Sequence, residues 1–265
     1  MFHIREGLNL PLNYKLLLSK MVMVWEFLLN YLDNLFLYIF INFKKLFRVK
    51  MHIQSDQNIL DELRKIQKDK NNWKDNINNV AVFLNESYSV EVKAKALWIM
   101  GEMGLAYPEE VKEHIDEIAG YMENEHPKLR ERSLNALGRI GRADNNLIIP
   151  YLDCLMEKRA DENERVRLSF IWACENIATN APELFCEKLD LYYEMISDSD
   201  EKVRIEAPEM FRVIGKRKPE HVKPYLEKLQ YVAQNDEHPV VRIHCEGAIR
   251  ITKKALKENG YSLKN

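Results

Sequence analysis

The chain has 265 residues, 46% of them hydrophobic and 30% charged, with 9 glycines and 9 prolines. No stretch alternates between apolar and polar residues over more than a few positions, so the composition and pattern exclude a β-rich fold. Residues 1–50 hold 7 of the 39 basic and 3 of the 41 acidic residues, which leaves 32 against 38, a net −6, for residues 51–265. This balance disfavours nucleic acid as the main ligand, because phosphate backbones are bound by an excess of lysine and arginine.

Residues 1–50 form a hydrophobic N-terminal extension, and within it residues 21–43 are as long as a membrane span. Glu26 and Asp33 lie inside that stretch, and a carboxylate near the middle of a span costs roughly 3 kcal/mol on insertion. Three interpretations stay open. The segment is a membrane anchor with the repeats in the cytoplasm, a helix packed on another surface, or no part of the native protein, which would then start at Met51.

Residues 51–70 are predicted to form an N-terminal capping helix, and a repeat follows them. In each repeat an apolar residue precedes a basic anchor, and successive anchors are 37, 37, 37 and 38 positions apart. The five pairs are Val92-Lys93, Leu129-Arg130, Val166-Arg167, Val203-Arg204 and Val241-Arg242. A period of this length predicts stacked helical pairs, an architecture that usually binds another molecule.

Other columns of the repeat predict where each helix begins and ends. Six residues before each anchor stands a short polar residue suited to an N-cap, namely Ser87, Asn124, Asp161, Asp198 and Asp236. Small residues at four of five equivalent places, such as Gly104 and Gly141, predict the end of the same helix. Prolines such as Pro108 and Pro219 predict the start of a partner helix. Pro208, inside the fourth long helix, is expected to kink or shorten it.

The pattern of Asp or Asn, then Val-Arg and a helix ending in Ile-Gly resembles the HEAT repeat, over residues 71–257. The resemblance implies a right-handed, armadillo-like α-solenoid of about five HEAT-like helical pairs, followed by a C-terminal tail at 258–265. It also implies a ladder of hydrogen bonds between neighbouring repeats. The ladder residues are Arg130, Asp161, Arg167, Asp198, Arg204, Asp236 and Arg242. Ser87 and Lys93 depart from the pattern, so the ladder should be weakest at the first repeat.

In HEAT-like proteins the second helix of each repeat lines the concave surface, which predicts the place of a partner. Positions two, five and nine after each anchor share a helical face that the apolar columns leave free. On that face two tryptophans flank a basic and amide-bearing centre, a mixture typical of protein interfaces. The candidate partner-binding residues are Trp98, Arg132, Asn135, Arg139, Trp172 and Asn176. The alternative is that both indoles pack against a neighbouring helix and complete the core.

The sequence favours binding over catalysis, and it predicts no catalytic residue, cofactor or metal site. Glu-His pairs before proline, as in Glu125-His126 and Glu237-His238, indicate turns. The four cysteines lie in helical patterns without a CxxC motif, as expected of buried thiols in a reducing cytoplasm. We therefore expect a cytoplasmic scaffold or adaptor whose partner is another protein. A DNA-repair protein of the alkylpurine glycosylase type, using the same groove, is the alternative. Contact with a membrane is expected only through residues 21–43.

Overall fold

A computed structural model describes residues 20, 23–25 and 55–260. The three interpretations of residues 1–50 therefore concern residues that lie almost entirely outside the described ranges. Of the two units into which the chain divides, Asn58–Asn265 contains the repeats. Within the described ranges, no helix has both the length and the apolar character that a membrane crossing requires.

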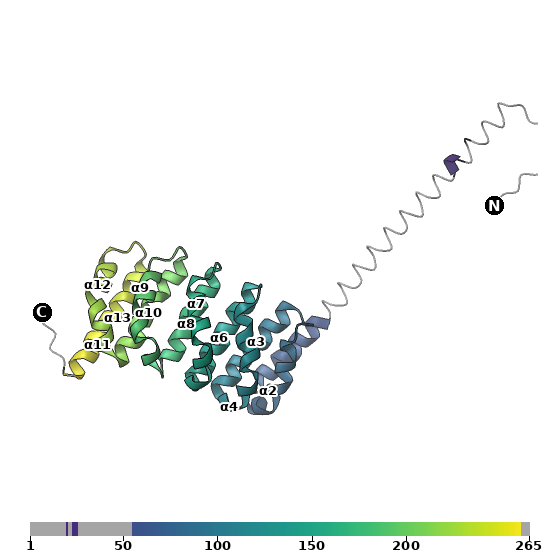
Figure 1. Ribbon diagram of the computed structural model, residues 1–265, viewed down its shortest axis with the longest axis horizontal. Helices are drawn as coiled ribbons and strands as arrows, with labels where there is room; N and C mark the ends of the chain where they lie inside the picture. The colour runs from purple at the N-terminus through teal and green to yellow at the C-terminus, as the bar shows by residue number, and fades with distance from the viewer. Residues whose placement is uncertain (1–19, 21–22, 26–54, 261–265) are drawn as a thin grey trace, which may run out of the picture. The chain divides into compact units, whose positions relative to one another are not determined.

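Five long helices form one layer of the repeat unit (Figure 1), and each packs on the next one along the chain. They are α3 (Val90–Ala106), α6 (Pro127–Ala143), α8 (Glu164–Ala178), α10 (Glu201–Arg217) and α13 (Pro239–Glu258). Each begins within a few residues of its predicted start. In every repeat the apolar residue before the basic anchor is buried. The apolar columns of the sequence are therefore the contacts between stacked repeats.

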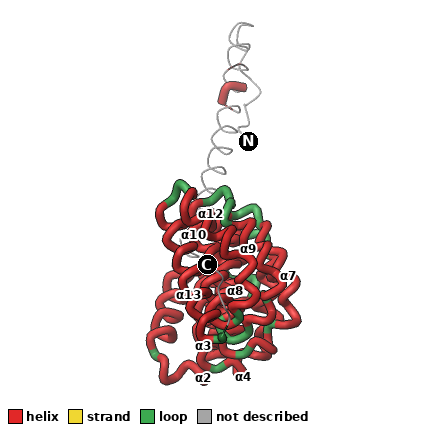
Figure 2. Tube along the Cα trace, turned by 90° about the vertical axis from the view of Figure 1, so that its left-hand side faces the viewer, coloured by secondary structure: helices red, strands yellow, loops and turns green. Residues whose placement is uncertain are grey.

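The partner helices are shorter and often interrupted by 3-10 turns. They are α2 (Trp73–Ala81), α4 (Pro108–Val111), α5 (Ile115–Gly120), α7 (Leu152–Glu157), α9 (Leu189–Met195), α11 (Pro219–Val222) and α12 (Leu226–Asn235). Figure 2 shows that short loops join the helices, and no strand occurs in the part of the chain that the structure describes. The predicted all-α solenoid of five helical pairs is confirmed. Helical residues 58–68 precede the first pair, and Leu63 among them is fully buried.

The helix N-caps lie two residues later than the sequence predicted. Ser89, His126, Asn163, Asp200 and His238 are the capping residues. At most repeats the residue predicted as cap instead accepts a hydrogen bond from the backbone of that capping residue, as Asp161 Oδ1 does from the Asn163 N–H at 2.9 Å. Both positions favour short polar side chains, so the sequence could not distinguish the turn residue from the cap.

Small residues let the first three long helices approach closely. A Cβ built on Gly101 would come 2.7 Å from the Ala136 Cα, and one built on Gly138 would come 2.6 Å from the Ala173 Cα. These glycines stand eight residues after their anchors, and Glu175 occupies the same column in α8. Accordingly, α8 and α10 share fewer close neighbours than the helices before them.

Pro208 does not shorten its helix, contrary to one of the two expectations for it. Helix α10 runs for 17 residues with Pro208 buried inside it. Packing on both neighbouring helices therefore outweighs the loss of one backbone hydrogen bond at the proline.

Candidate functional site

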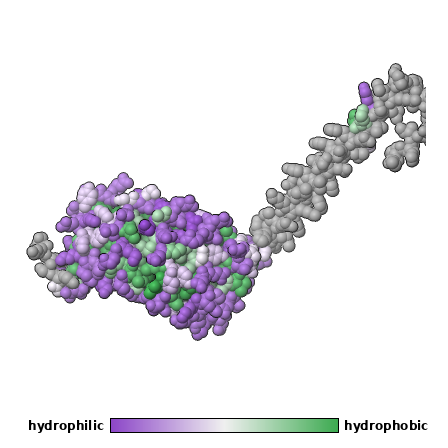
Figure 3. All heavy atoms as spheres, in the orientation of Figure 1, coloured by the Kyte–Doolittle hydropathy of each residue, from purple (hydrophilic) through white to green (hydrophobic). Residues whose placement is uncertain are grey.

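The candidate site lies on the face of the long helices that the apolar columns leave free. Its residues stand two, five and nine positions after each basic anchor, and we call this set the long-helix face. Most of the corresponding side chains in α3, α6, α8, α10 and α13 are neither fully buried nor fully exposed. On the face that Figure 3 shows, the repeat unit is mainly hydrophilic, with apolar patches among the hydrophilic residues.

Trp98 on α3 is covered by two arginines from the next long helix. The Arg139 Cζ lies 4.0 Å and the Arg132 Cζ 5.0 Å from the centroid of its ring. Trp98 is half-buried and packs against the hydrophobic core as well. Cation–π contacts of this kind stabilise by about 0.5–2 kcal/mol, more when water is excluded. The structure thus brings three of the six predicted partner-binding residues into one cluster.

Arg139 is held in place from two sides. Its Nε lies 2.7 Å from Glu102 Oε1, and its Nη1 donates to the Asn135 carbonyl at 3.0 Å. Burial lowers the pKa of Arg139, an effect that Glu102 partly offsets. Asn135 itself is only 7% exposed, and its amide donates to the Ser169 hydroxyl at 3.2 Å. Asn135 therefore joins α6 to α8, and it offers little surface to a partner.

Trp172 on α8 is the more exposed indole, with 38% of its surface accessible. Burial raises the pKa of Glu206 on α10, and the neighbouring Trp172 side chain partly offsets that rise. Asn176, one helical turn later, donates to the Trp172 carbonyl at 2.8 Å and accepts from Arg142 at 3.4 Å. The two tryptophans thus differ, because Trp98 is partly a core residue and Trp172 mainly a surface one.

Beside Trp172 the long-helix face is acidic, a feature that the sequence reasoning missed. Glu175, Glu206 and Glu209 gather there from α8 and α10, with Glu209 buried and its carboxylate paired to Arg212. His244 Nδ1 lies 3.3 Å from Glu209 Oε1. Burial, with the nearby Glu206 and Glu209 charges, raises the pKa of Glu175 to about 9. The signal was present in the repeat, because Glu175 occupies a column that holds glycine in α3 and α6.

Two steps of the predicted ladder are two-point ion pairs. Arg130 donates to both carboxylate oxygens of Asp161 at 2.8 Å, and Arg167 to those of Asp198 at 2.8 and 2.7 Å. Burial alone would raise the pKa of either aspartate, but the arginine bonds outweigh it and lower the pKa. The aspartates lie in the loops that precede α8 and α10, and the arginines lie in the first turns of α6 and α8. None of the four belongs to the long-helix face, so the pairs align repeats and do not shape the site.

The ladder does not continue to Asp236 as predicted. Arg204 and Arg242 donate to carbonyls of their own loops, those of Asp198 and Asp236 among them. Within residues 55–260 no ion pair joins Arg204 to Asp236. The reason is spacing: each formed pair spans 31 residues, whereas Arg204 and Asp236 are 32 apart. At the first repeat the equivalent positions hold Lys93 and Asn124, and an asparagine carries no charge to pair with a lysine.

The remaining chemistry-bearing side chains have structural places. The Nδ1 atoms of His126 and His238 accept the N–H of Lys128 and Val240, each at 3.3 Å, so these histidines cap helices. Cys154, Cys174, Cys186 and Cys245 are free thiols. Burial raises the pKa of Cys245 to about 12, and a thiol that stays protonated is a weak nucleophile. Among the described residues no cluster suited to a metal ion occurs.

The fold places the chain in the class of HEAT- and armadillo-like repeat solenoids. The sequence model of the sister chromatid cohesion protein PDS5 family matches residues 30–246, most of the chain. The chain belongs to this family, which confirms the predicted class of repeat. No curated protein matches its sequence.

Several solved structures of similar fold are engineered repeat proteins. A designed armadillo repeat protein in complex with the peptide (KR)4 has a TM-score of 0.56 and 20% identity, over 74% of this chain and 92% of that one. A computationally designed armadillo repeat protein for modular peptide recognition has a TM-score of 0.51 and 16% identity, over 74% and 93%. Another engineered protein has a TM-score of 0.56 at 15% identity, over 77% and 92%. At these identities the likeness concerns the fold alone.

Proposed function

We propose that the chain is an adaptor that binds an extended segment of another protein along its long-helix face. The observation that carries this proposal is the exposed indole of Trp172, which stands at the same repeat position as Trp98, two repeats along the stack. Tryptophan and arginine are the residues that most often dominate binding energy at interfaces. A rigid row of helices presents such side chains at fixed spacing, so little order has to be created on binding.

Two further observations support a peptide as the ligand. Designed solenoids of similar fold include one in complex with a peptide, and a row of repeats suits an extended chain because each repeat adds one equivalent contact position. Arg132, Arg139 and Asn176 lie next to the two indoles and are at least partly exposed. We assign them to the same surface, with Asn135 as the residue that positions α6 against α8.

All four cysteines are free thiols, three of them buried and Cys154 partly exposed. Free thiols are consistent with a reducing compartment. We propose the cytoplasm, as the cysteine pattern of the sequence also indicates.

The test is a selection of short random peptides, displayed on phage, against the full chain. Peptides enriched on the wild type are expected to lose binding to Trp172→Ala, and to bind Trp98→Phe more weakly, because each variant removes indole contacts without emptying the core. Tyr231→Ala is the matched control, since Tyr231 is 68% exposed but belongs to the partner helix α12. Equal loss with Tyr231→Ala, or retention by Trp172→Ala, would contradict a binding site on the long-helix face.

A further inference from the structure

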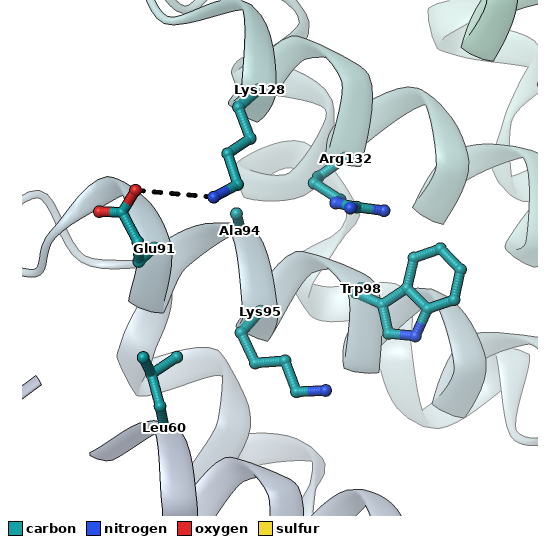
Figure 4. Close-up of a pocket in the computed structure, with 7 residues that line it drawn as sticks. All are labelled: Leu60, Glu91, Ala94, Lys95, Trp98, Lys128 and Arg132. Carbon is teal, nitrogen blue, oxygen red and sulfur yellow. Dashed lines mark ion pairs between the residues drawn. The ribbon is translucent and has the colours of Figure 1, made fainter. Parts of the chain in front are cut away.

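A pocket opens beside Trp98 between α3 and α6, and positive charge surrounds it. It has a volume of about 440 Å³ and is lined by Leu60, Glu91, Ala94, Lys95, Trp98, Lys128 and Arg132. In Figure 4 the Lys95 amine and the Arg132 guanidinium both extend toward Trp98 from neighbouring repeats. A pocket of this size admits one side chain of a peptide.

The positive charge of the pocket is only partly compensated. Lys128 has a carboxylate partner in the pocket, Glu91 Oε1 at 3.6 Å, and Arg132 has one outside it, Glu131 Oε1 at 3.6 Å. The Lys95 amine donates to the neutral side-chain oxygen of Gln67. Burial, together with repulsion from Arg64 and Arg132, lowers the pKa of Lys95. An anion between Lys95 and Arg132 would relieve this repulsion.

Arg132 is also oriented for an anion. Its guanidinium carbon lies 5.0 Å from the centroid of the Trp98 indole, and a guanidinium can donate two N–H groups side by side to one carboxylate. The Trp98 indole is held in place as well, because Arg139 lies over the ring and is itself paired with Glu102. The donors are therefore largely in place before a ligand arrives.

We propose that this pocket takes an acidic side chain of the bound peptide, held between Lys95 and Arg132 and packed against Trp98. This inference rests on the proposed adaptor function and adds the chemistry of one contact. The far half of the long-helix face argues for a peptide over nucleic acid. There the partly exposed Glu206 would repel a continuous phosphate backbone, whereas a peptide changes charge from one residue to the next and fits both halves.

The test is a coupling measurement on the full chain with a peptide taken from the phage selection. The acidic residue that the selection enriches is replaced by its amide, and binding of the fluorescently labelled pair is measured. On the wild type the amide is expected to weaken binding about tenfold, as close charge pairs do. On Lys95→Gln and Arg132→Gln the two peptides should bind almost equally. Lys216→Gln, an exposed cation on α10, is the matched control and should keep the full difference.

The outcomes separate the two proposals. If enriched peptides need Trp172 but carry no acidic preference, or if the amide costs the same on Arg132→Gln as on the wild type, the anion pocket is overturned while the adaptor stands. If no peptide depends on Trp172, both fail. A short labelled duplex that binds more tightly than any peptide, and is lost with Arg132→Gln, would assign the pocket to phosphate and overturn the peptide. Thermal unfolding of each variant shows that the fold is kept.

Discussion

Gly138 on α6 lies directly against Ala173 on α8, with room for a hydrogen but not for a methyl group. The same close approach joins Gly101 to Ala136 one repeat earlier. In both places the nearest atoms belong to backbone, which cannot move aside without shifting a helix.

We therefore expect Gly138→Ala to destabilise the fold by about 1–3 kcal/mol through overpacking, although alanine favours a helix by about 1 kcal/mol. Gly247→Ala is the control, since apart from the adjacent backbone of α13 no atom lies within 4 Å of the place that the new methyl group would take. It should stabilise by up to about 1 kcal/mol. Urea unfolding of both variants measures the difference, and a stabilising effect at both sites would show that the helices are not in contact at Gly138.

The ladder predicts that two similar arginines differ in importance. Arg167→Lys should destabilise by about 1–3 kcal/mol, because lysine cannot make the two-point bond to the part-buried Asp198. Arg204→Lys should cost less, since Arg204 donates to loop carbonyls and not to a carboxylate. Both variants keep the charge, so a comparison of their urea midpoints isolates the bond geometry. Equal losses would show that the ion pair contributes nothing beyond the carbonyl bonds.

The raised pKa of Glu175 predicts that the free energy of unfolding falls as the pH rises. Its pKa is about 9 in the fold, against 4.5 as the ordinary value, so the folded state holds a proton that the unfolded state releases between those limits. The contribution of Glu175 to stability is complete below pH 4.5 and declines by roughly 1 kcal/mol per pH unit up to about pH 9. Glu175→Gln should flatten this decline and raise the melting temperature at about pH 8.

Glu157→Gln removes an exposed carboxylate from α7 and serves as the control. It should leave the pH profile of the wild type unchanged. If Glu175→Gln also leaves the pH profile unchanged, the Glu175 carboxyl is ionised in the folded protein and the predicted decline is wrong. Arg212 is the cation that opposes the rise in pKa, so Arg212→Gln should steepen the decline.

The two tryptophans should separate in stability. Trp98→Ala removes a ring that packs on the core and carries two arginines, and we expect a loss of about 2–4 kcal/mol. Trp172→Ala should cost about 1 kcal/mol or less, because Trp172 is the more exposed of the two, with 38% of its surface accessible. Thermal unfolding gives both values. A larger loss for Trp172→Ala would return that residue to the core.

The stack of repeats could be predicted from the sequence because every repeat buries residues at the same positions. An alignment that was wrong by one residue would have failed in all five repeats. The sequence did not predict features that depend on a single residue. The extra residue between Arg204 and Asp236 was visible as a spacing of 38 between anchors, yet its effect on the ladder depends on how the loop absorbs it. The side-chain amide of Asn135 could in principle bind a partner. Only the structure shows that this amide is already hydrogen-bonded to Ser169 on the neighbouring helix.

The contact between α8 and α10 has an ion pair at one end and the Glu175 carboxyl group at the other. Arg167 and Asp198 hold the two helices together near their N-termini, while Glu175, two turns further along, occupies the column where glycine brings the earlier helices together. A linear array opens at its weakest interface. We therefore expect the array to open first at this contact. A protein segment bound along the long-helix face on both sides of it would hold the two blocks of repeats together.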